Sequence, residues 1–409
     1  MGEHTLEDLQ QLQALPLNLK IRLTQTRIRT WVNEFGSDGV YVSFSGGKDS
    51  TVLLDIVRKM YPEIEAVFCD TGLEYPEIRE FVKTFDNVTW LKPKMSFFQV
   101  CEKYGFPLIS KEVSECVYGA RKYLTSIMES ASLDRQTDRQ TDRQTDRLRM
   151  LTDTKSYADL VSLVRQTKGG QIESTENSEG LENLIDNAKL QIVLGIYRMN
   201  GKATMENIPN EADRSAFSCE RYQFFLDAPF EIASKCCSVM KKEPMNRFAK
   251  ETGKLPITAQ MAAESRLRTQ QWLKNGCNAF NNKHPVSNPM SFWTEQDVLL
   301  YIVENNLPIC SVYGDIIKTN EVKGQLDLAD LGLFELERPH LETTGCHRTG
   351  CILCGYGCHL EKKGEGRFER LKETHPKFYN LLNVAKNNGV TFAEAIQWTN
   401  EHGDLHIRI

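Results

Sequence analysis

A strand, a glycine turn and a helix follow one another without interruption over residues 40–54, and this stretch constrains the fold more than any other. Residues 40–44 alternate β-branched and aromatic side chains, which is typical of a buried parallel strand. From residue 49 to about residue 60, apolar side chains recur at helical spacing. Further short strands and helices alternate behind this stretch. The pattern predicts an α/β fold with an open parallel sheet and a ligand at the carboxyl ends of its strands.

The turn itself reads Ser45-Gly46-Gly47-Lys48-Asp49-Ser50. Its glycines let the backbone approach a ligand and turn N–H groups inward, while the following helix directs its positive dipole to the same point. Lys48 adds a full positive charge, so the turn predicts a site for phosphate or sulfate. A glycine turn with a surface lysine is the alternative. The common P-loop is excluded, because it would need glycine in place of Val42 and Ser or Thr in place of Asp49.

A second expected strand, over residues 65–69, ends in Asp70, Thr71 and Gly72. An acidic residue at this position of a βαβ unit meets a nucleotide ribose or a metal ion. The alternative is that Asp70 caps a helix over residues 74–85. The same periodicities predict helices over residues 5–35 with a break near Pro16, a strand over residues 88–91, and helices over residues 97–104 and 295–305.

Composition narrows the class of protein and its compartment. Of the 409 residues, 40% are hydrophobic and 26% are charged, which is ordinary for a globular protein. The apolar runs are shorter than a membrane span and no secretory signal is visible, so we expect a cytoplasmic protein without a membrane partner. A net charge of -5 argues against a wholly basic nucleic-acid binder. Twelve cysteines without an export signal predict thiols and metal ligands.

Residues 119–215 interrupt the α/β pattern. They include an Asp-Arg-Gln-Thr repeat over residues 134–147 that has no apolar side chain, which predicts a solvated helix or a disordered linker. A helix is expected over residues 184–198. The chain is accordingly divided into a nucleotide-binding α/β core at 1–118, a polar helical insertion at 119–215, the remainder of the core at 216–340 and a cysteine-rich metal-binding region at 341–409.

Two groups of cysteines stand apart from the others. Cys236 and Cys237 are adjacent, and the second group consists of Cys346, Cys351, Cys354 and Cys358. A Cys-x2-Cys pair directs two thiolates to one metal, and four thiolates satisfy either zinc or a [4Fe–4S] cluster. One interpretation is a local site made by the second group. Another joins Cys236 and Cys237 to Cys351 and Cys354, and a third is that no metal is bound.

Four stretches of the chain resemble one protein family. The turn at residues 45–50 is similar to the pyrophosphate (PP) loop of the ATP pyrophosphatase superfamily. Asp-Thr-Gly at residues 70–72, followed by Tyr-Pro-Glu at 75–77, resembles the phosphoadenosine-phosphosulfate (PAPS) reductases. Residues 258–268 are similar to the Arg-Ala-x-Glu-Ser segment of that family, with Met261 where many members carry arginine. Residues 347–357 resemble the Arg-Thr-Gly-Cys segment of PAPS-reductase-like proteins from prophages and mobile elements.

The resemblance implies a PP-loop fold of the adenine nucleotide alpha-hydrolase type, with ATP or PAPS as ligand and magnesium as an accompanying ion. It implies catalytic roles for Lys48, Asp49 and Asp70. Arg266 and Arg268 would bind a second anion, such as sulfate or a 3′-phosphate, unless they are simply surface arginines. The implied nucleotide-binding residues are Ser45, Gly46, Gly47, Lys48, Asp49, Ser50, Asp70, Thr71, Gly72, Glu264, Arg266, Arg268 and Arg348.

The resemblance also favours the second interpretation of the cysteines. Lys235-Cys236-Cys237, followed by Lys241, Lys242 and Pro244 and by a distant Cys-x2-Cys, resembles the iron–sulfur ligand arrangement of adenylylsulfate and PAPS reductases. It implies a [4Fe–4S] cluster, or zinc as the alternative, on Cys236, Cys237, Cys351 and Cys354. Cys346 and Cys358 would then be additional thiols near the cluster.

Three functions are consistent with these residues. In a reductase, a thiolate attacks the sulfur of PAPS or adenylylsulfate and a thiol reductant then releases sulfite. Family reductases carry that nucleophile in a C-terminal Glu-Cys-Gly-Leu-His, whereas no cysteine follows Cys358 here, so Cys346 or Cys358 would have to substitute for it. In an ATP pyrophosphatase, a nucleic acid is adenylated and then thiolated. The third function is a non-catalytic nucleotide sensor with a mobile-element protein as partner. We expect a homo-oligomer.

Overall fold

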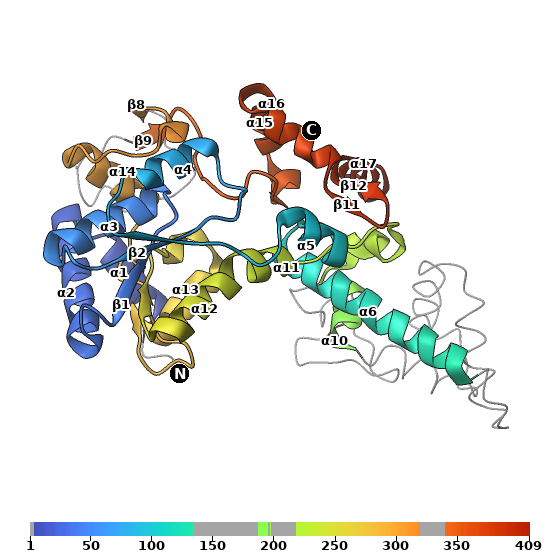
Figure 1. The fold of residues 1–409 in the computed structure, drawn as a ribbon, viewed down its shortest axis with the longest axis horizontal. Coiled ribbons are helices and arrows are strands. Elements are labelled where there is room, and N and C mark those ends of the chain that lie inside the picture. The colour runs from blue at the N-terminus through green and yellow to red at the C-terminus, as the bar shows by residue number, and fades with distance from the viewer. Residues whose placement is uncertain (1–3, 135–186, 195–196, 198–217, 320–339) are drawn as a thin grey trace. The chain divides into compact units, whose positions relative to one another are not determined.

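The structure is a computed structural model that describes residues 4–134, 187–194, 197, 218–319 and 340–409. The chain forms two compact units (Figure 1). Unit 1 combines Met1–Lys94 with Val239–Ile352, and unit 2 combines Met95–Ser238 with Leu353–Ile409. Each unit is therefore built from two separate parts of the sequence.

Unit 1 is organised around a six-stranded sheet in the order β3-β2-β1-β5-β7-β6. β1 is central and pairs in parallel with both β2 and β5, so that Val42 lies opposite Ala66 on one side and Ile257 on the other. The pairs β2–β3 and β5–β7 are also parallel, and the edge pair β6–β7 is antiparallel. The strands are β1 (Val40–Ser43), β2 (Ala66–Cys69), β3 (Val88–Leu91), β5 (Leu255–Ile257), β6 (Asn278–Ala279) and β7 (Val286–Ser287). The predicted α/β fold with a parallel sheet is confirmed.

The remaining elements of unit 1 are mostly helices that connect these strands (Figure 1). An antiparallel pair, β8 (Ile316–Thr319) and β9 (His340–Thr343), lies outside the main sheet. The helices are α1 (Leu6–Gln13), α2 (Leu17–Phe35), α3 (Lys48–Met60), α4 (Pro76–Lys83), most of the π-helix η4 (Ser238–Lys242), α12 (Glu243–Thr252), the 3-10 helix η5 (Ala262–Glu264), α13 (Arg266–Asn275), α14 (Glu295–Glu304) and the 3-10 helix η6 (Ser311–Tyr313).

The N-terminal helices are fixed to a late part of the chain by buried polar contacts. Lys20 Nζ on α2 lies 2.6 Å from Asp297 Oδ2 on α14, and these side chains are 1% and 4% exposed. The indole nitrogen of Trp293 donates to Thr24 Oγ1 over 2.9 Å. Because a buried ion pair is costly unless both partners are in place, α2 and α14 depend on one another.

Unit 2 has an aromatic core and three short strand pairings, two of them between named strands. Phe106 and Phe392 are stacked with ring centroids 4.8 Å apart, and Phe230 meets Trp398 edge-on at 5.4 Å. The elements are α5 (Phe97–Tyr104), β4 (Leu108–Ile109), α6 (Lys111–Asp134), α10 (Ala188–Val193), η3 (Glu220–Asp227), α11 (Lys235–Cys237), β10 (Gly355–Tyr356), η8 (Cys358–Leu360), α15 (Arg367–Thr374), α16 (Pro376–Tyr379), η9 (Asn380–Asn383), β11 (Lys386–Asn387), β12 (Val390–Thr391) and α17 (Phe392–Gly403).

Most predicted elements are present within a residue or two of their expected ends. The helical pattern over 5–35 divides at Pro16, and α14 begins at a capping box formed by Thr294 and Asp297. The helix expected over 74–85 is shorter, because Pro76 starts it and Thr84 ends it. The repeat beyond residue 134 lies outside the described residues, and the predicted domain boundaries remain predictions. Among the described helices, none combines the length and apolar character that a membrane crossing requires.

Candidate functional site

The turn between β1 and α3, residues 45–50, is called the glycine loop below. Gly46 has a φ of 70°, and a Cβ at this position would lie 2.8 Å from Val82 Cγ2 and 2.9 Å from Ile78 Cγ2, both on α4. Glycine is therefore required for conformation and for space. Gly47 is the N-cap of α3 and has no side chain to cap the first N–H groups of the helix. Gly47 thus leaves the first N–H groups of α3 to other partners, and the binding of an anion there stays a prediction.

Two serines hold the glycine loop in shape. Ser50 Oγ donates to the Gly47 carbonyl over 2.9 Å and accepts from the Ser45 N–H over 3.2 Å. The Ser45 and Ser50 hydroxyls are 3.0 Å apart. These bonds close the loop on itself, so its backbone is ordered before any ligand arrives.

Lys48 is 3% exposed, so the alternative of a surface lysine is wrong. Its Nζ donates to the His347 carbonyl over 3.0 Å and lies 3.0 Å from Glu295 Oε1. Burial pulls the pKa of Lys48 down, but Asp49 and Glu295 raise it more, so the pKa lies above its ordinary value. The ammonium is therefore charged and held inside the protein.

Asp49 supplies a carboxylate beside this ammonium. Its side chain is 30% exposed, yet Oδ1 is buried and has no hydrogen-bond donor within the described part of the chain. Oδ1 lies 3.6 Å from Lys48 Nζ, which is beyond hydrogen-bond distance. Burial raises the pKa of Asp49, and Lys48 partly offsets this rise. A buried carboxylate oxygen without a donor is suited to a cation or to a ligand that brings a proton.

Tyr313 and Thr349 cover the start of α3, and no sequence pattern predicts this role for Tyr313. Tyr313 is 2% exposed, and its Oη accepts from the Lys48 backbone N–H over 3.0 Å. Thr349 Oγ1 is 2.7 Å from the same phenol oxygen, and both hydroxyls lie 3.1 Å from where a Cβ on Gly47 would be. An amide that is expected to meet an anion is therefore hydrogen-bonded to a side-chain hydroxyl in this structure.

Two of the predicted arginines lie within electrostatic reach of Asp49. Burial lowers the pKa of Arg268, Arg348 lowers it further, and Asp49 raises it, so these three charges act on one another. Arg268 forms an ion pair with Glu264 and borders a cavity of about 240 Å³. Arg266, at the first position of α13, is exposed, as is Arg348. The glycine loop thus has a second cationic group near it, which one stretch of sequence alone does not reveal.

The Asp70 carboxylate is already hydrogen-bonded within unit 1. Its carboxylate accepts from Arg79 Nη2 over 2.9 Å and from the Gly72 N–H over 3.1 Å. Thr71 donates to Glu74 through its N–H and its hydroxyl. The alternative of Asp70 as a helix cap is wrong, because α4 starts at Pro76 without a side-chain cap. Its role as a ligand contact stays a prediction.

Comparison with protein families identifies the fold that carries this loop. The family model described as phosphoadenosine phosphosulfate reductase domain matches residues 39–114 and 190–355, which is more than half of the chain. The chain belongs to this family. The matched PAPS reductase segments contain the glycine loop, Arg268, Arg348 and the four predicted cluster cysteines. Residues 1–38 and 115–189 lie outside them.

Individual relatives match shorter pieces. The chain is 41% identical over 73 residues to an uncharacterized protein of Methanocaldococcus jannaschii, covering 17% of this chain and 18% of that protein. It is 31% identical over 107 residues to an adenosine 5′-phosphosulfate reductase of Neisseria meningitidis, covering 26% and 41%. The chain thus spans about two fifths or less of these curated relatives. The crystal structure of PAPS reductase from Candida auris, phosphate complex, aligns over 85% of this chain and 98% of that one, with 15% identity and a TM-score of 0.32.

The cysteines predicted for the PAPS reductase cluster lie in both units. Within unit 2, burial raises the pKa of Tyr356, and Cys236, Cys237 and Cys354 raise it further, so three of the thiols are within electrostatic reach of one phenol. Within unit 1, Cys351 acts on Cys69, whose pKa burial raises to about 11. In the described residues no three His, Cys, Asp or Glu side chains are placed as ligands of one metal. The four-thiol ligand set stays a prediction.

The two additional thiols are buried. Cys346 is 7% exposed and Cys358 is 2% exposed. The Cys358 thiol donates to the Cys354 carbonyl over 3.4 Å, and burial raises its pKa to about 12. Since the thiolate is the nucleophile, Cys358 in this conformation is poorly suited to attack a substrate.

Proposed function

We propose that the chain is a PAPS reductase-family enzyme that binds an adenine nucleotide through the glycine loop and reduces or transfers sulfur. The observation that carries the proposal is the buried Lys48 ammonium at the start of α3, beside an Asp49 carboxylate oxygen for which the described residues provide no hydrogen-bond donor. Burying these charges is costly, and a purely structural turn does not need them. An anion with its counter-cation would use both.

Nucleotide binding would exchange contacts within unit 1. A phosphate oxygen replaces Tyr313 Oη as the acceptor for the Lys48 N–H, and Lys48 Nζ turns from Glu295 to the phosphate. Arg268 and Arg348 contact a second anionic group of the same ligand. Asp49 Oδ1 and Glu295 are the carboxylates that would hold magnesium, which supplies charge neutralisation at the leaving phosphate when ATP is bound.

In the reductase reaction, a thiolate attacks the sulfur of PAPS or adenylylsulfate. A sulfur–sulfur bond forms, and the bond from sulfur to the phosphate oxygen breaks with its electron pair leaving on the nucleotide. A second thiol then attacks the enzyme sulfur, forms a disulfide and releases sulfite, so two thiols supply the two electrons. Cys358 is a poor candidate for the nucleophile of this reaction, because it is buried and burial raises its pKa to about 12.

The buried Lys48 beside Asp49 also suits a second candidate, an ATP pyrophosphatase that activates an acceptor for thiolation. An acceptor oxygen attacks the α-phosphate of ATP, pyrophosphate leaves with the electron pair, and a sulfur donor later displaces AMP. A nucleic acid is the proposed acceptor. Lys48 in this reaction neutralises the leaving pyrophosphate.

A [4Fe–4S] cluster on Cys236, Cys237, Cys351 and Cys354 is part of the proposal, with zinc as the alternative. The donor chemistry supports it, since four thiolates suit either group and three of these thiols act on one half-buried phenol, that of Tyr356. A cluster would supply electrons or fix charge near the substrate. The kinship to prophage and mobile-element proteins, the cytoplasmic location and the homo-oligomer also remain predictions.

Product assays separate the candidates. We expect the anaerobically purified protein to release sulfite from PAPS or adenylylsulfate with a dithiol, or pyrophosphate from ATP with a nucleic-acid acceptor, and to lose that activity in Lys48→Ala. Nucleotide binding without either product would identify a sensor. Absence of adenine-nucleotide binding in a folded protein would contradict all three functions.

A further inference from the structure

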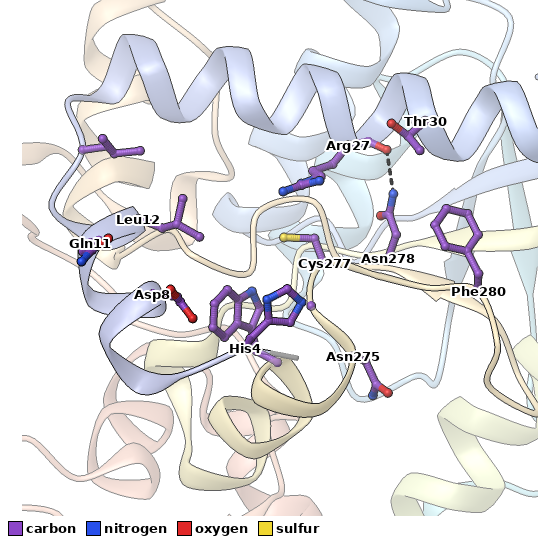
Figure 2. Close-up of a pocket in the computed structure, with 13 residues that line it drawn as sticks. His4, Asp8, Gln11, Leu12, Arg27, Thr30, Asn275, Cys277, Asn278 and Phe280 are labelled. Carbon is purple, nitrogen blue, oxygen red and sulfur yellow. Dashed lines mark hydrogen bonds between the residues drawn. The ribbon is translucent and has the colours of Figure 1, made fainter. Parts of the chain in front are cut away.

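A cavity of about 550 Å³ in unit 1 lies where α1 and α2 meet residues 272–280 (Figure 2). Asn278 Nδ2 donates to the Arg27 carbonyl over 3.0 Å, which joins α2 to β6. The His4 and Trp272 rings are tilted by 36° with centroids 5.0 Å apart, so they do not form a flat wall. The lining mixes apolar, amide and oppositely charged side chains and selects no class of ligand. Its contacts account for the packing of the N-terminal helices, and a more specific arrangement lies in unit 2.

The strand β10 fixes the stretch of chain that begins at Cys354, one of the predicted cluster ligands. It follows Cys354 directly and pairs in parallel with β4, where Tyr356 lies opposite Ile109. The Gly357 N–H donates to the Ile109 carbonyl over 2.8 Å. Ile109 is buried and has a φ of 65°, a strained value for a β-branched residue. Such strain persists only where the surrounding contacts fix the backbone, so this pairing has one defined geometry.

Tyr356 joins the Cys354 stretch to the other predicted ligands of unit 2. Its Oη donates to the Ala233 carbonyl over 3.1 Å, and Ala233 lies three residues before Cys236 and four before Cys237. The two stretches are therefore connected by the protein's own hydrogen bonds, without a metal.

Arg367 holds the carbonyl of Cys354 itself. Its Nη1 donates to the Cys354 carbonyl oxygen over 2.7 Å, and its Nη2 lies 3.3 Å from Glu361 Oε1. The Arg367 backbone N–H also donates to Glu361 Oε2 over 2.8 Å. One guanidinium fork thus bridges a carboxylate and the backbone of a predicted ligand, a geometry that lysine does not reproduce.

Arg367 occupies a position where a cation is not favoured for the helix itself. It is the first residue of α15, where the positive end of the helix dipole repels a positive charge. Glu361 offsets this charge, and Arg408 Nη1 donates to the Glu361 carbonyl over 2.5 Å. The arrangement therefore stabilises the backbone around Cys354 more than it stabilises the start of α15.

We propose that Arg367 is a positioning residue for the Cys354 ligand and that Arg367 and Glu361 together tune the bound cluster. This inference rests on the proposed four-cysteine site. Partners behind a metal ligand typically contribute ten- to hundredfold in metal affinity. A positive charge near Cys354 favours the reduced, more negative cluster, and the carboxylate of Glu361 opposes it.

Metal retention and the midpoint potential test the proposal on the anaerobically purified full chain. We expect Arg367→Gln to lose iron to a chelator about tenfold faster than the unmodified chain. Its midpoint potential should shift to a more negative value, whereas that of Glu361→Gln should shift to a more positive one. Arg367→Lys, which keeps the charge without the fork, should lose iron faster but keep the potential. A stretch that had merely loosened would shift the potential in the same direction in Arg367→Gln and Glu361→Gln.

Lys372→Gln is the matched control, because Lys372 is an exposed cation in the last turn of the same helix. It should match the unmodified chain in both measurements, and urea unfolding of the metal-free proteins checks that every variant folds. If Arg367→Gln and Arg367→Lys hold the metal as firmly as the unmodified chain, the positioning role is wrong while the four-cysteine site stands. If the unmodified chain holds no metal, or if Cys237→Ser leaves the metal in place, the proposed site fails and the inference fails with it.

Discussion

The glycine loop and the predicted cluster cysteines are assembled in different ways. The loop is made by six consecutive residues that follow β1 and include the first three residues of α3, and its shape is fixed by Gly46 and by two serines within it. The cysteines come from two distant stretches of sequence, and the chain places Cys351 in unit 1 and the other three in unit 2.

This difference separates a site that is already formed from one that a ligand would complete. Local hydrogen bonds hold the loop without a nucleotide, so its geometry is a property of the chain. The predicted four-thiol set would take its geometry from the metal it binds, because metal binding at such a site is coupled to folding. The predictions below test each half of this contrast.

The largest effect is expected at the cysteines. Cys237→Ser should remove nearly all bound iron and the broad brown absorption of anaerobically purified protein, because a cluster that lacks one thiolate is not retained. Cys358→Ser is the matched control and should keep the iron, since Cys358 is a buried thiol outside the predicted ligand set. Colourless protein whose single zinc is lost in Cys237→Ser would favour the zinc alternative, whereas zinc that Cys237→Ser leaves in place would contradict the predicted set of four cysteines.

Lys48→Ala should weaken adenine-nucleotide binding by about 100-fold, because it removes a charge-assisted contact and leaves Asp49 and Glu295 without their ammonium. Equilibrium dialysis with labelled ATP and PAPS measures this effect, and circular dichroism confirms folding. Lys59→Ala, which removes an exposed lysine further along α3, is the control. If the unmodified chain, Lys48→Ala and Lys59→Ala bind the nucleotide with equal affinity, the glycine loop is not the nucleotide-binding site.

Gly46→Ala should destabilise the chain by about 2 kcal/mol, because alanine is strained at positive φ and its Cβ would strike Ile78 and Val82. The midpoint of urea unfolding measures the change. Gly253→Ala is the control for the cost of alanine at positive φ, since Gly253 also has a positive φ but no atom near its Cβ position. If the two variants lose the same stability, close packing against α4 does not shape the loop.

Tyr313→Phe should tighten nucleotide binding by a few-fold, because it frees the Lys48 N–H from its intramolecular acceptor and leaves the ring in place. Titration of ATP or PAPS against both proteins measures the change. Weaker binding in Tyr313→Phe would show that the phenol contacts the ligand itself, and the loop would then not be complete without it.

The smallest effect concerns pH. Burial raises the pKa of Asp49, so its proton is held more tightly in the folded chain and ionisation costs stability above that pKa. Asp49→Asn should therefore be at least as stable as the unmodified chain at pH 7, and the difference should shrink as the pH falls through the ordinary Asp range. Urea midpoints from pH 3 to pH 7 measure this (about 3.9 is the ordinary pKa). If Asp49→Asn is much less stable than the unmodified chain at every pH, the expected direction of this effect is wrong.

Sequence periodicity was sufficient for the parts of the fold that are local. The strand over 40–44, the break at Pro16 and the helix over 295–305 were predicted because each follows from neighbouring residues. The central position of β1 was not predictable, since its partner β5 comes from residues more than two hundred positions later.

The candidate site divides in the same manner. Gly46, Gly47 and Lys48 could be predicted from one short stretch, whereas Tyr313 and Glu295 approach the loop from distant elements with no signal in their own sequence. Thr349 lies in the stretch that resembles the Arg-Thr-Gly-Cys segment, so it was within reach of sequence comparison. The contact of Asp70 with Arg79 was not predicted. The two residues are only nine positions apart, but a turn and the start of α4 lie between them.

The sheet order of unit 1 also bears on how the chain folds during synthesis. β1 and β2 emerge from the ribosome early, but β1 has an open hydrogen-bonding edge until β5 at Leu255–Ile257 has been made. The ion pair of Lys20 forms later still, because its buried partner Asp297 is synthesised after β5. We therefore expect the nascent N-terminal half to be prone to aggregation and to depend on chaperones until about three quarters of the chain has left the ribosome.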